Sequence, residues 1–252
     1  MNRAAQGFLL FLIGGAVLRT SLSQEYLRFV KPGLRPLLLV AAVVLMLTAA
    51  ATIWSELRAR RARKTADADD GHGHGHHAAR VAWLLLLPLF ALIALVPPAL
   101  GSYAADRSGT ALQQPLAYAD LPTGDPVQLT LLDYAGRAVY DGRSVAGRRV
   151  EISGFVTLGP HGAPYLTRMV LNCCAADAQP VKVELSGALP AQIRPDLWLD
   201  VVGRYVGRQS RDEVNGGPIP YLDVASAHPV SQPADPYQNM QSDTFRSYRP
   251  LA

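Results

Sequence analysis

The stretch RVEISGFVTL, Arg149–Leu158, sets the fold of the second half of the chain. Its apolar residues Val150 and Ile152 alternate with polar ones, and the pattern resumes at Phe155 after Gly154. A period of two is typical of a β-strand with one buried face, and a glycine inside a strand often marks a bulge or a sharp bend. The sequence therefore predicts a bent strand here.

Four segments downstream repeat this pattern, so that five strands are predicted. The four are Tyr165–Asn172, Val181–Ser186, Leu197–Val206 and Pro220–Ala225. Five short strands within about 80 residues, with a glycine inside the first and the fourth, indicate an all-β domain of the OB-like five-stranded barrel class. A small β-sandwich is the alternative. Leu129–Tyr140 fits a short amphipathic helix, and Pro190–Pro195 lies where OB folds often carry a helix between strands three and four.

The charge of the chain divides near the start of this second half. The net charge of +4 over 252 residues is made up of +6 in residues 1–103 and −2 in residues 104–252. Single-stranded nucleic acids are bound by basic grooves with stacking aromatic side chains. The β domain is slightly acidic and has few aromatic residues, so we expect no nucleic-acid binding.

Three apolar runs in the first half predict two or three transmembrane helices. Val81–Leu100 has 20 residues without a charge, Leu37–Trp54 has 18, and Ala4–Leu18 has 15. About 20 apolar residues cross the hydrocarbon core as a helix, and the shortest run reaches Leu22 if Arg19 extends toward the headgroups. For that run a cleaved signal peptide is the alternative, although no clear A-x-A cleavage site follows it.

Loop charge predicts the orientation of these helices. The loop at about 55–80 carries six basic residues, Arg58, Arg60, Arg61, Arg63, Lys64 and Arg80. Because loops rich in Lys and Arg are retained in the cytoplasm, we expect this loop inside and the second half of the chain outside. Four basic residues between the first two runs weaken the contrast.

The predicted organisation is that of a multi-pass protein of the plasma membrane with an extracytoplasmic β domain. Residues 1–103 form the transmembrane region, 104–126 a linker rich in Ala, Gly and Pro, 127–230 the OB-like domain, and 231–252 a Pro-rich tail.

The cytoplasmic loop contains a histidine tract, DADDGHGHGHH at Asp67–His77. Imidazole and carboxylate ligands suit zinc, nickel or copper. The tract is therefore a candidate metal site, with the ligands His72, His74, His76, His77, Asp69 and Asp70. The alternative is a solvated low-complexity linker that binds metals incidentally.

A second candidate site lies in LNCCAADAQPV, Leu171–Val181, where Cys173 and Cys174 are the only cysteines of the chain. A single adjacent pair excludes a framework of several disulfides. With Asp177 it places two thiols and a carboxylate on one connection, whereas a zinc site generally uses three or four protein ligands. A buried cysteine with Asp177 capping a turn is one alternative, and a thiol redox pair is another. No nucleophile–base–orienter set is visible, so we expect no enzyme.

Taken together, these features resemble the YcgQ-like family, membrane proteins of unknown function that are typically encoded beside a YcgR-type permease. The most specific element is CCAADA at Cys173–Ala178, in which Cys174 and Asp177 match the steadier family positions. Supporting elements are GRRVEISGFV at Gly147–Val156, LWLDVVG at Leu197–Gly203 and DPY at Asp235–Tyr237.

The resemblance implies a non-enzymatic accessory subunit of a permease, with a link to zinc or another divalent metal that rests on the histidine tract. Three spans without ionisable residues in their apolar cores are too few for a usual transport pathway, so a permease partner is expected. A membrane-tethered metal-binding protein or metallochaperone acting alone is the alternative, and a thiol redox protein is a third hypothesis.

Overall fold

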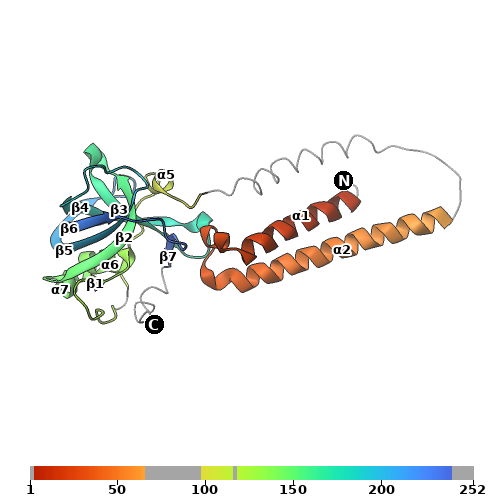
Figure 1. Cartoon of the computed structure of the whole chain (residues 1–252), viewed down its shortest axis with the longest axis horizontal. Coiled ribbons are helices and arrows are strands. Elements are labelled where there is room, and N and C mark those ends of the chain that lie inside the picture. The colour runs from red at the N-terminus through yellow and green to blue at the C-terminus, as the bar shows by residue number, and fades with distance from the viewer. Residues whose placement is uncertain (1–2, 66–97, 116–117, 240–252) are drawn as a thin grey trace. The chain divides into compact units, whose positions relative to one another are not determined.

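The computed structural model describes residues 3–65, 98–115 and 118–239, and the chain divides into two compact units (Figure 1). The first unit consists of Met1–Tyr26 and Pro32–Pro98, and the second of Leu27–Lys31 and Ala99–Ala252. The histidine tract and nearly all of the predicted third span lie outside the described residues. The four histidines and two aspartates of that tract therefore stay a prediction.

Two helices form the described part of the first unit. Helix α1 is Arg3–Leu22 and α2 is Arg35–Thr65, and the 3₁₀ turns Gln24–Arg28 and Pro32–Leu34 lie between them. Among the described residues, the stretch Pro32–Ala59, which consists of the turn Pro32–Leu34 and most of α2, is the one helix long and apolar enough to cross a membrane. Its most apolar 18-residue window has a mean hydropathy of 2.5. This apolar helix indicates membrane association, whereas the number of spans and their orientation stay predictions.

Small residues at the interface let α1 and α2 pack closely. On α1 the buried residues recur every seven positions, and on α2 two buried alanines have the same spacing: Gly7, Gly14 and Ser21, with Ala42 and Ala49. Seven residues are nearly two helical turns, so each set occupies one face. A Cβ atom on Gly14 would lie 2.9 Å from Cγ of Met46, which shows how close the helices are.

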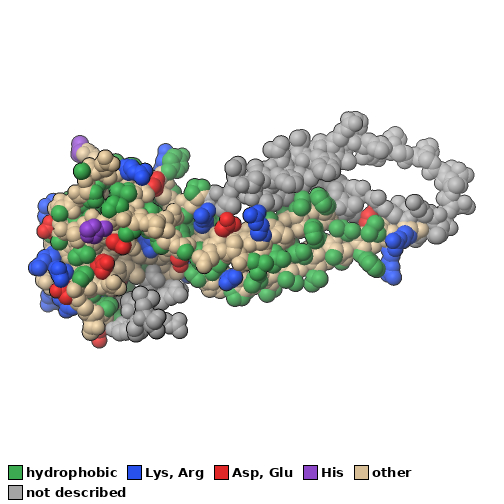
Figure 2. All heavy atoms as spheres, viewed as in Figure 1, with side chains coloured by type: hydrophobic (Ala, Val, Ile, Leu, Met, Phe, Trp, Pro, Cys, Tyr) green, Lys and Arg blue, Asp and Glu red, His purple; other side chains and the backbone are tan. Residues whose placement is uncertain are grey.

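The outer surface of α2 is apolar. Only 11 % of its most hydrophobic 18-residue window is buried. Figure 2 shows hydrophobic side chains along this helix, and the large exposed ones include Leu37, Val40, Val44, Leu47 and Trp54. Water disfavours such a surface, and the length and composition of the helix suit a membrane.

The second unit contains a seven-stranded mixed sheet. Its strands are β1 Val127–Gln128, β2 Arg149–Leu158, β3 Pro164–Leu171, β4 Gln179–Gly187, β5 Trp198–Arg211, β6 Pro218–Pro229 and β7 Tyr237–Asn239. The order is β1-β2-β5-β6-β4-β3-β7, and β2 also pairs with β3. The β1–β2, β3–β7 and β4–β6 pairs are parallel, and the others are antiparallel. All five predicted strands are confirmed, β2 at its predicted bounds.

Helix α6, Leu131–Tyr140, packs on this sheet near its predicted position. Thr130 caps it by accepting a hydrogen bond from the backbone N–H of Asp133 at 3.0 Å. The helix buries Leu131, Tyr134 and Ala135 against strand residues that include Val150, Ile152, Leu166, Val183, Leu199 and Leu222. The domain also contains the short helices α5, Ser102–Ala105, and α7, Gly142–Val145, and the 3₁₀ turns η3, Pro160–Gly162, and η4, Ala175–Asp177.

Three segments differ from the sequence-based description. Residues 190–195 contain no helix, because a residue that precedes a proline is biased away from helical geometry and prolines stand at both ends. Within the predicted tail, Tyr237–Asn239 is a strand, because Tyr237 is buried beside Phe155 and Trp198. The predicted linker is bound to the sheet at Ala111, whose backbone N–H donates to Pro180 O of β4 at 2.9 Å.

Candidate functional site

The two cysteines lie on the connection between β3 and β4, residues 172–178, which we call the cysteine loop. Cys174 is extended, with φ −150° and ψ 172°, and precedes η4 as its N-cap. Asp177 is the third residue of this turn, and its carboxylate accepts from the backbone N–H of Cys174 at 3.3 Å. In return, the Cys174 side chain accepts from the backbone N–H of Asp177. This reciprocal arrangement is a capping box, which satisfies the backbone donors at the start of a helical turn.

Asp177 binds three consecutive backbone N–H groups of the loop. Oδ1 accepts from Asn172 at 3.0 Å and from Cys174, and Oδ2 accepts from Cys173 at 2.7 Å. Burial raises the pKa of Asp177, but the hydrogen bonds from the Cys173 thiol and from these N–H groups outweigh it, so the pKa lies below its usual value. At neutral pH Asp177 is therefore an ionised anchor for the backbone of both cysteines.

The two thiols are close together and free. Sγ of Cys173 lies 3.7 Å from Sγ of Cys174, with Cys173 exposed and Cys174 partly buried. Hydrogen bonds to Asp177 and then to Cys174 raise the pKa of Cys173 to about 11. Because the thiolate is the reactive form, Cys173 is a weak nucleophile at neutral pH.

The sulfur separation is compatible with a metal bound by both thiolates. Two sulfurs each about 2.3 Å from a tetrahedral zinc ion lie about 3.8 Å apart. One ligand atom from each of Cys173, Cys174 and Asp177 falls within 4.8 Å of the others, and the described residues contain no other such group of three. The structure thus brings together all three residues predicted for this site.

The two other histidines of the domain do not join this group. His161 lies in η3 with a left-handed backbone, φ 56°, and His228 lies on β6 opposite Asp200 of β5. The metal-ligand set of the cysteine loop therefore has at most three side chains among the described residues, and open positions would be left on a bound ion.

One partner of the cysteine loop was not predicted from the sequence: the segment Leu27–Lys31, between α1 and α2. Val30 and Cys174 form an antiparallel bridge, and the backbone N–H of Ala175 donates to Phe29 O at 2.7 Å. The backbone N–H of Lys31 donates to Cys173 O at 3.4 Å. Five residues far upstream show no periodicity that could have predicted this pairing.

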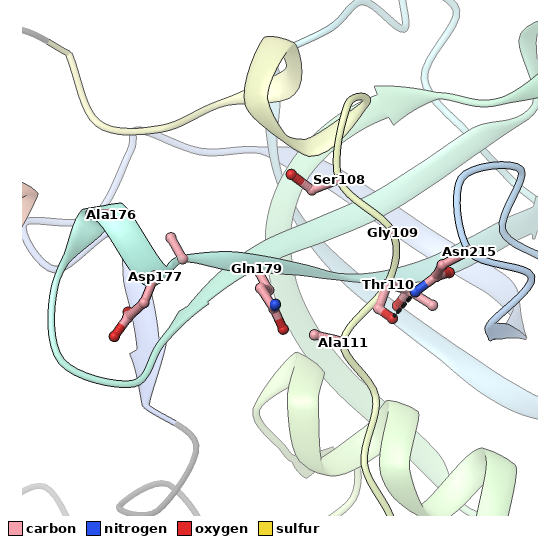
Figure 3. A pocket seen from close by; sticks show the side chains of 9 residues that line it. Ser108, Gly109, Thr110, Ala111, Ala176, Asp177, Gln179 and Asn215 are labelled. Carbon is pink, nitrogen blue, oxygen red and sulfur yellow. Dashed lines mark hydrogen bonds between the residues drawn. The ribbon is translucent and has the colours of Figure 1, made fainter.

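A polar pocket of about 420 Å³ adjoins the loop. Figure 3 shows Ser108, Gln179 and Asn215 around it, with Asp177 at one end. The Nδ2 group of Asn215 donates to Thr110 O at 3.0 Å and holds one wall. The described residues that line the pocket include one charged side chain, Asp177.

A buried ion pair supports the wall of this pocket. Lys182 Nζ donates to Asp212 Oδ2 at 2.8 Å and to Ser108 O at 3.2 Å. Asp212 also accepts from the backbone N–H groups of Thr110 and Val214. Burial raises the pKa of Asp212, but Lys182 and these N–H groups outweigh it, so the pKa lies below its usual value.

Comparison with known proteins bears on the β domain. No curated protein and no solved structure matches the chain. Residues 139–238, from the end of α6 into β7, match the model of an uncharacterised family, the DUF1980 C-terminal domain. The part of the chain that carries the cysteine loop is therefore similar to the DUF1980 C-terminal domain.

Proposed function

We propose that this chain is a non-enzymatic, membrane-anchored accessory subunit that binds zinc or another soft divalent metal at the cysteine loop and works with a permease. The observation that carries the proposal is the convergence of Cys173, Cys174 and Asp177 within 4.8 Å. Thiolates are strong ligands for zinc, and three protein ligands leave a position open for exchange. An exposed site of this kind suits transient holding of an ion.

The position of Leu27–Lys31 supports an extracytoplasmic site. This segment joins α1 to α2 and belongs to the same compact unit as the β domain. If both helices span the membrane, the segment and the domain are on one side of it. Five of the six basic residues at about 55–80 stand at the end of α2. By the rule for loop charge this end of the helix is retained inside, so the cysteine loop is outside and the histidine tract inside.

The apolar surface of α2 supports a partner within the membrane. Leu37–Trp54 has no ionisable side chain, and several of its large side chains are exposed, among them Leu37, Val40, Val44, Leu47 and Trp54. Such a surface suits contacts with other membrane helices, and the family resemblance points to a YcgR-type multi-span permease. The partner supplies the transport pathway, and this chain supplies the external metal site.

The strand pairings favour an OB-like five-stranded barrel as the scaffold. Pairing passes from β2 to β5, β6, β4 and β3, and β3 pairs with β2 again. The parallel β4–β6 pair has the position of the parallel pair in an OB-type Greek key. In this proposal α6, upstream of β2, replaces the helix expected between the third and fourth strands.

Zinc titration of the full chain in detergent, under reducing conditions, tests the metal site. To silence the histidine tract, His72, His74, His76 and His77 are first replaced by alanine. We expect one bound zinc, and a loss of affinity of about tenfold or more in Cys174→Ser, because one thiolate ligand is lost. His161→Ala, outside the site, is the matched control and keeps the affinity. If the protein with these four alanine substitutions binds no zinc, the proposal is contradicted.

Crosslinked affinity purification from native membranes tests the partner. Recovery of one multi-span permease in near-equal amount supports the accessory-subunit function. Recovery of the chain alone, with the zinc site intact, favours a membrane-tethered metal-binding protein or metallochaperone that acts without a permease.

A thiol redox pair is the second candidate, favoured by the 3.7 Å distance between two free sulfurs. The raised pKa of Cys173 makes it a weak nucleophile for disulfide exchange, whereas a bound zinc ion itself displaces the thiol proton. Alkylation of the protein in intact membranes decides between the two. Free thiols on both cysteines exclude the redox function, and a disulfide between them supports it.

A further inference from the structure

We propose that metal binding at the cysteine loop strengthens its pairing with Leu27–Lys31, so that the connection between α1 and α2 responds to the occupancy of the site. This inference rests on the proposed metal-binding function and adds its regulation.

The connection pairs with the very residues that carry the thiols. Val30 is the bridge partner of Cys174, and Cys173 O accepts from the backbone N–H of Lys31 at 3.4 Å. The shortest bond, 2.7 Å, joins the backbone N–H of Ala175 to Phe29 O. A change in the backbone at residues 173–175 therefore acts directly on residues 29–31.

The helix ends on either side of this connection are joined to each other. Arg35 Nε donates to Ser21 O at 3.0 Å, which joins the start of α2 to the end of α1. The Arg35 guanidinium also lies 5.5 Å from the ring centroid of buried Tyr26.

A metal ion restrains the loop where the pairing occurs. Sγ of Cys173 lies 3.7 Å from Sγ of Cys174, a separation that one ion bound to both sulfurs allows. Zinc bound by both thiolates releases the two thiol protons to solvent without any redox change. One ion then joins the side chains of adjacent residues, which restricts the backbone from 173 to 175. A restrained strand segment loses less conformational entropy when it pairs, so metal binding and pairing favour each other.

Ala175→Pro removes the central bond of this pairing with little other change. Ala175 is the first residue of η4, where proline is well accommodated, and Cys174 already has the extended backbone that precedes a proline. The variant lacks the donor to Phe29 O, while the three donors to Asp177 come from other residues. Ala175→Ser keeps the backbone N–H and is the matched control.

The test uses the full chain with alanine at His72, His74, His76 and His77. It measures hydrogen exchange at Leu27–Lys31 with and without zinc, and it also measures the zinc affinity. We expect zinc to slow exchange of this segment about fivefold or more in the unaltered loop and in Ala175→Ser. Because coupling is reciprocal, Ala175→Pro weakens zinc binding by a similar factor and abolishes the change in exchange.

Two outcomes overturn the inference, and they differ in what else they affect. If zinc binds and exchange at Leu27–Lys31 is unchanged, the coupling is wrong and the proposed metal site stands. If no zinc binds, the metal-binding function fails and the coupling fails with it.

Discussion

Asp177 shows how one side chain organises the candidate site. Its carboxylate could serve as a metal ligand, but both oxygens already accept backbone hydrogen bonds from Asn172, Cys173 and Cys174. These bonds draw the backbone of the two cysteines around the carboxylate and set the direction of their thiols. Asp177 is thus a positioning residue first, and any bond to a metal uses lone pairs that the backbone leaves available.

Replacing Asp177 by alanine should destabilise the domain at neutral pH. Loss of a capping side chain costs about 1 kcal/mol of the free energy of unfolding. Since the pKa of Asp177 is lowered by folding, its contribution is present above the usual carboxyl pKa of about 3.9 and is lost as pH falls through the folded value. Chemical denaturation at pH 7 and at pH 2.5 measures both effects.

Asp177→Asn is the control for this prediction, because it keeps one acceptor oxygen and should lose less stability than alanine. The prediction is contradicted if Asp177→Ala unfolds at the same denaturant concentration as the unaltered chain at pH 7. It is also contradicted if the difference between the two persists unchanged in acid.

At the scale of elements, the α1–α2 pair depends on its small residues. Gly14→Val should disrupt the pair, because the new Cβ would lie 2.9 Å from Met46 Cγ and 3.2 Å from Leu45 Cβ. Overpacking of this kind typically costs about 1–3 kcal/mol. Gly15→Val is a matched control on the same helix, since nothing lies within 4 Å of its Cβ position. Thermal unfolding in detergent, followed by helical circular dichroism, should show a lower Tm for Gly14→Val alone. Equal Tm values for the two variants would count against the observed packing.

The pairing of Lys182 on β4 with Asp212 after β5 is a second element-scale feature. Asp212→Asn leaves the Lys182 ammonium, 7 % exposed, without its counter-charge. Breaking a buried ion pair on one side costs about 3–5 kcal/mol, so the domain should unfold at much lower denaturant concentration. Glu213→Gln changes an exposed neighbour and should have almost no effect. If Asp212→Asn is as stable as Glu213→Gln, the ion pair does not support the domain.

The sequence predicted the elements whose pattern is local. Strand β2 has its predicted bounds because alternation and the Gly154 break are both visible in ten residues. Strands β1 and β7 were missed because they have two and three residues, too few for a period to appear. Strand β7 forms through burial of Tyr237 among distant residues, which no local pattern reveals.

In the candidate site too, the residues that are close in the sequence were predicted and the distant contacts were not. Cys173, Cys174 and Asp177 lie within five consecutive residues, so their convergence follows from one turn. The pairing with Leu27–Lys31 and the nearby pocket bring together residues from distant parts of the chain. Such contacts are set by the packing of the whole domain, and the sequence alone did not indicate them.

At the scale of the whole molecule, the chain combines an apolar helix suited to a membrane with a β domain that presents two thiols. The segment Leu27–Lys31, between α1 and α2 in the chain, belongs to the compact unit of the β domain. The proposed function uses both parts: the helices contact a permease, and the domain holds a metal ion outside the cytoplasm. Its central claim is that both cysteines of the loop bind the ion.

X-ray absorption spectroscopy at the zinc edge tests this claim most directly. The sample is the full chain with alanine at His72, His74, His76 and His77, loaded with one equivalent of zinc under reducing conditions. The account predicts two sulfur ligands at about 2.3 Å, and one in Cys174→Ser. A zinc environment of nitrogen and oxygen alone would contradict it.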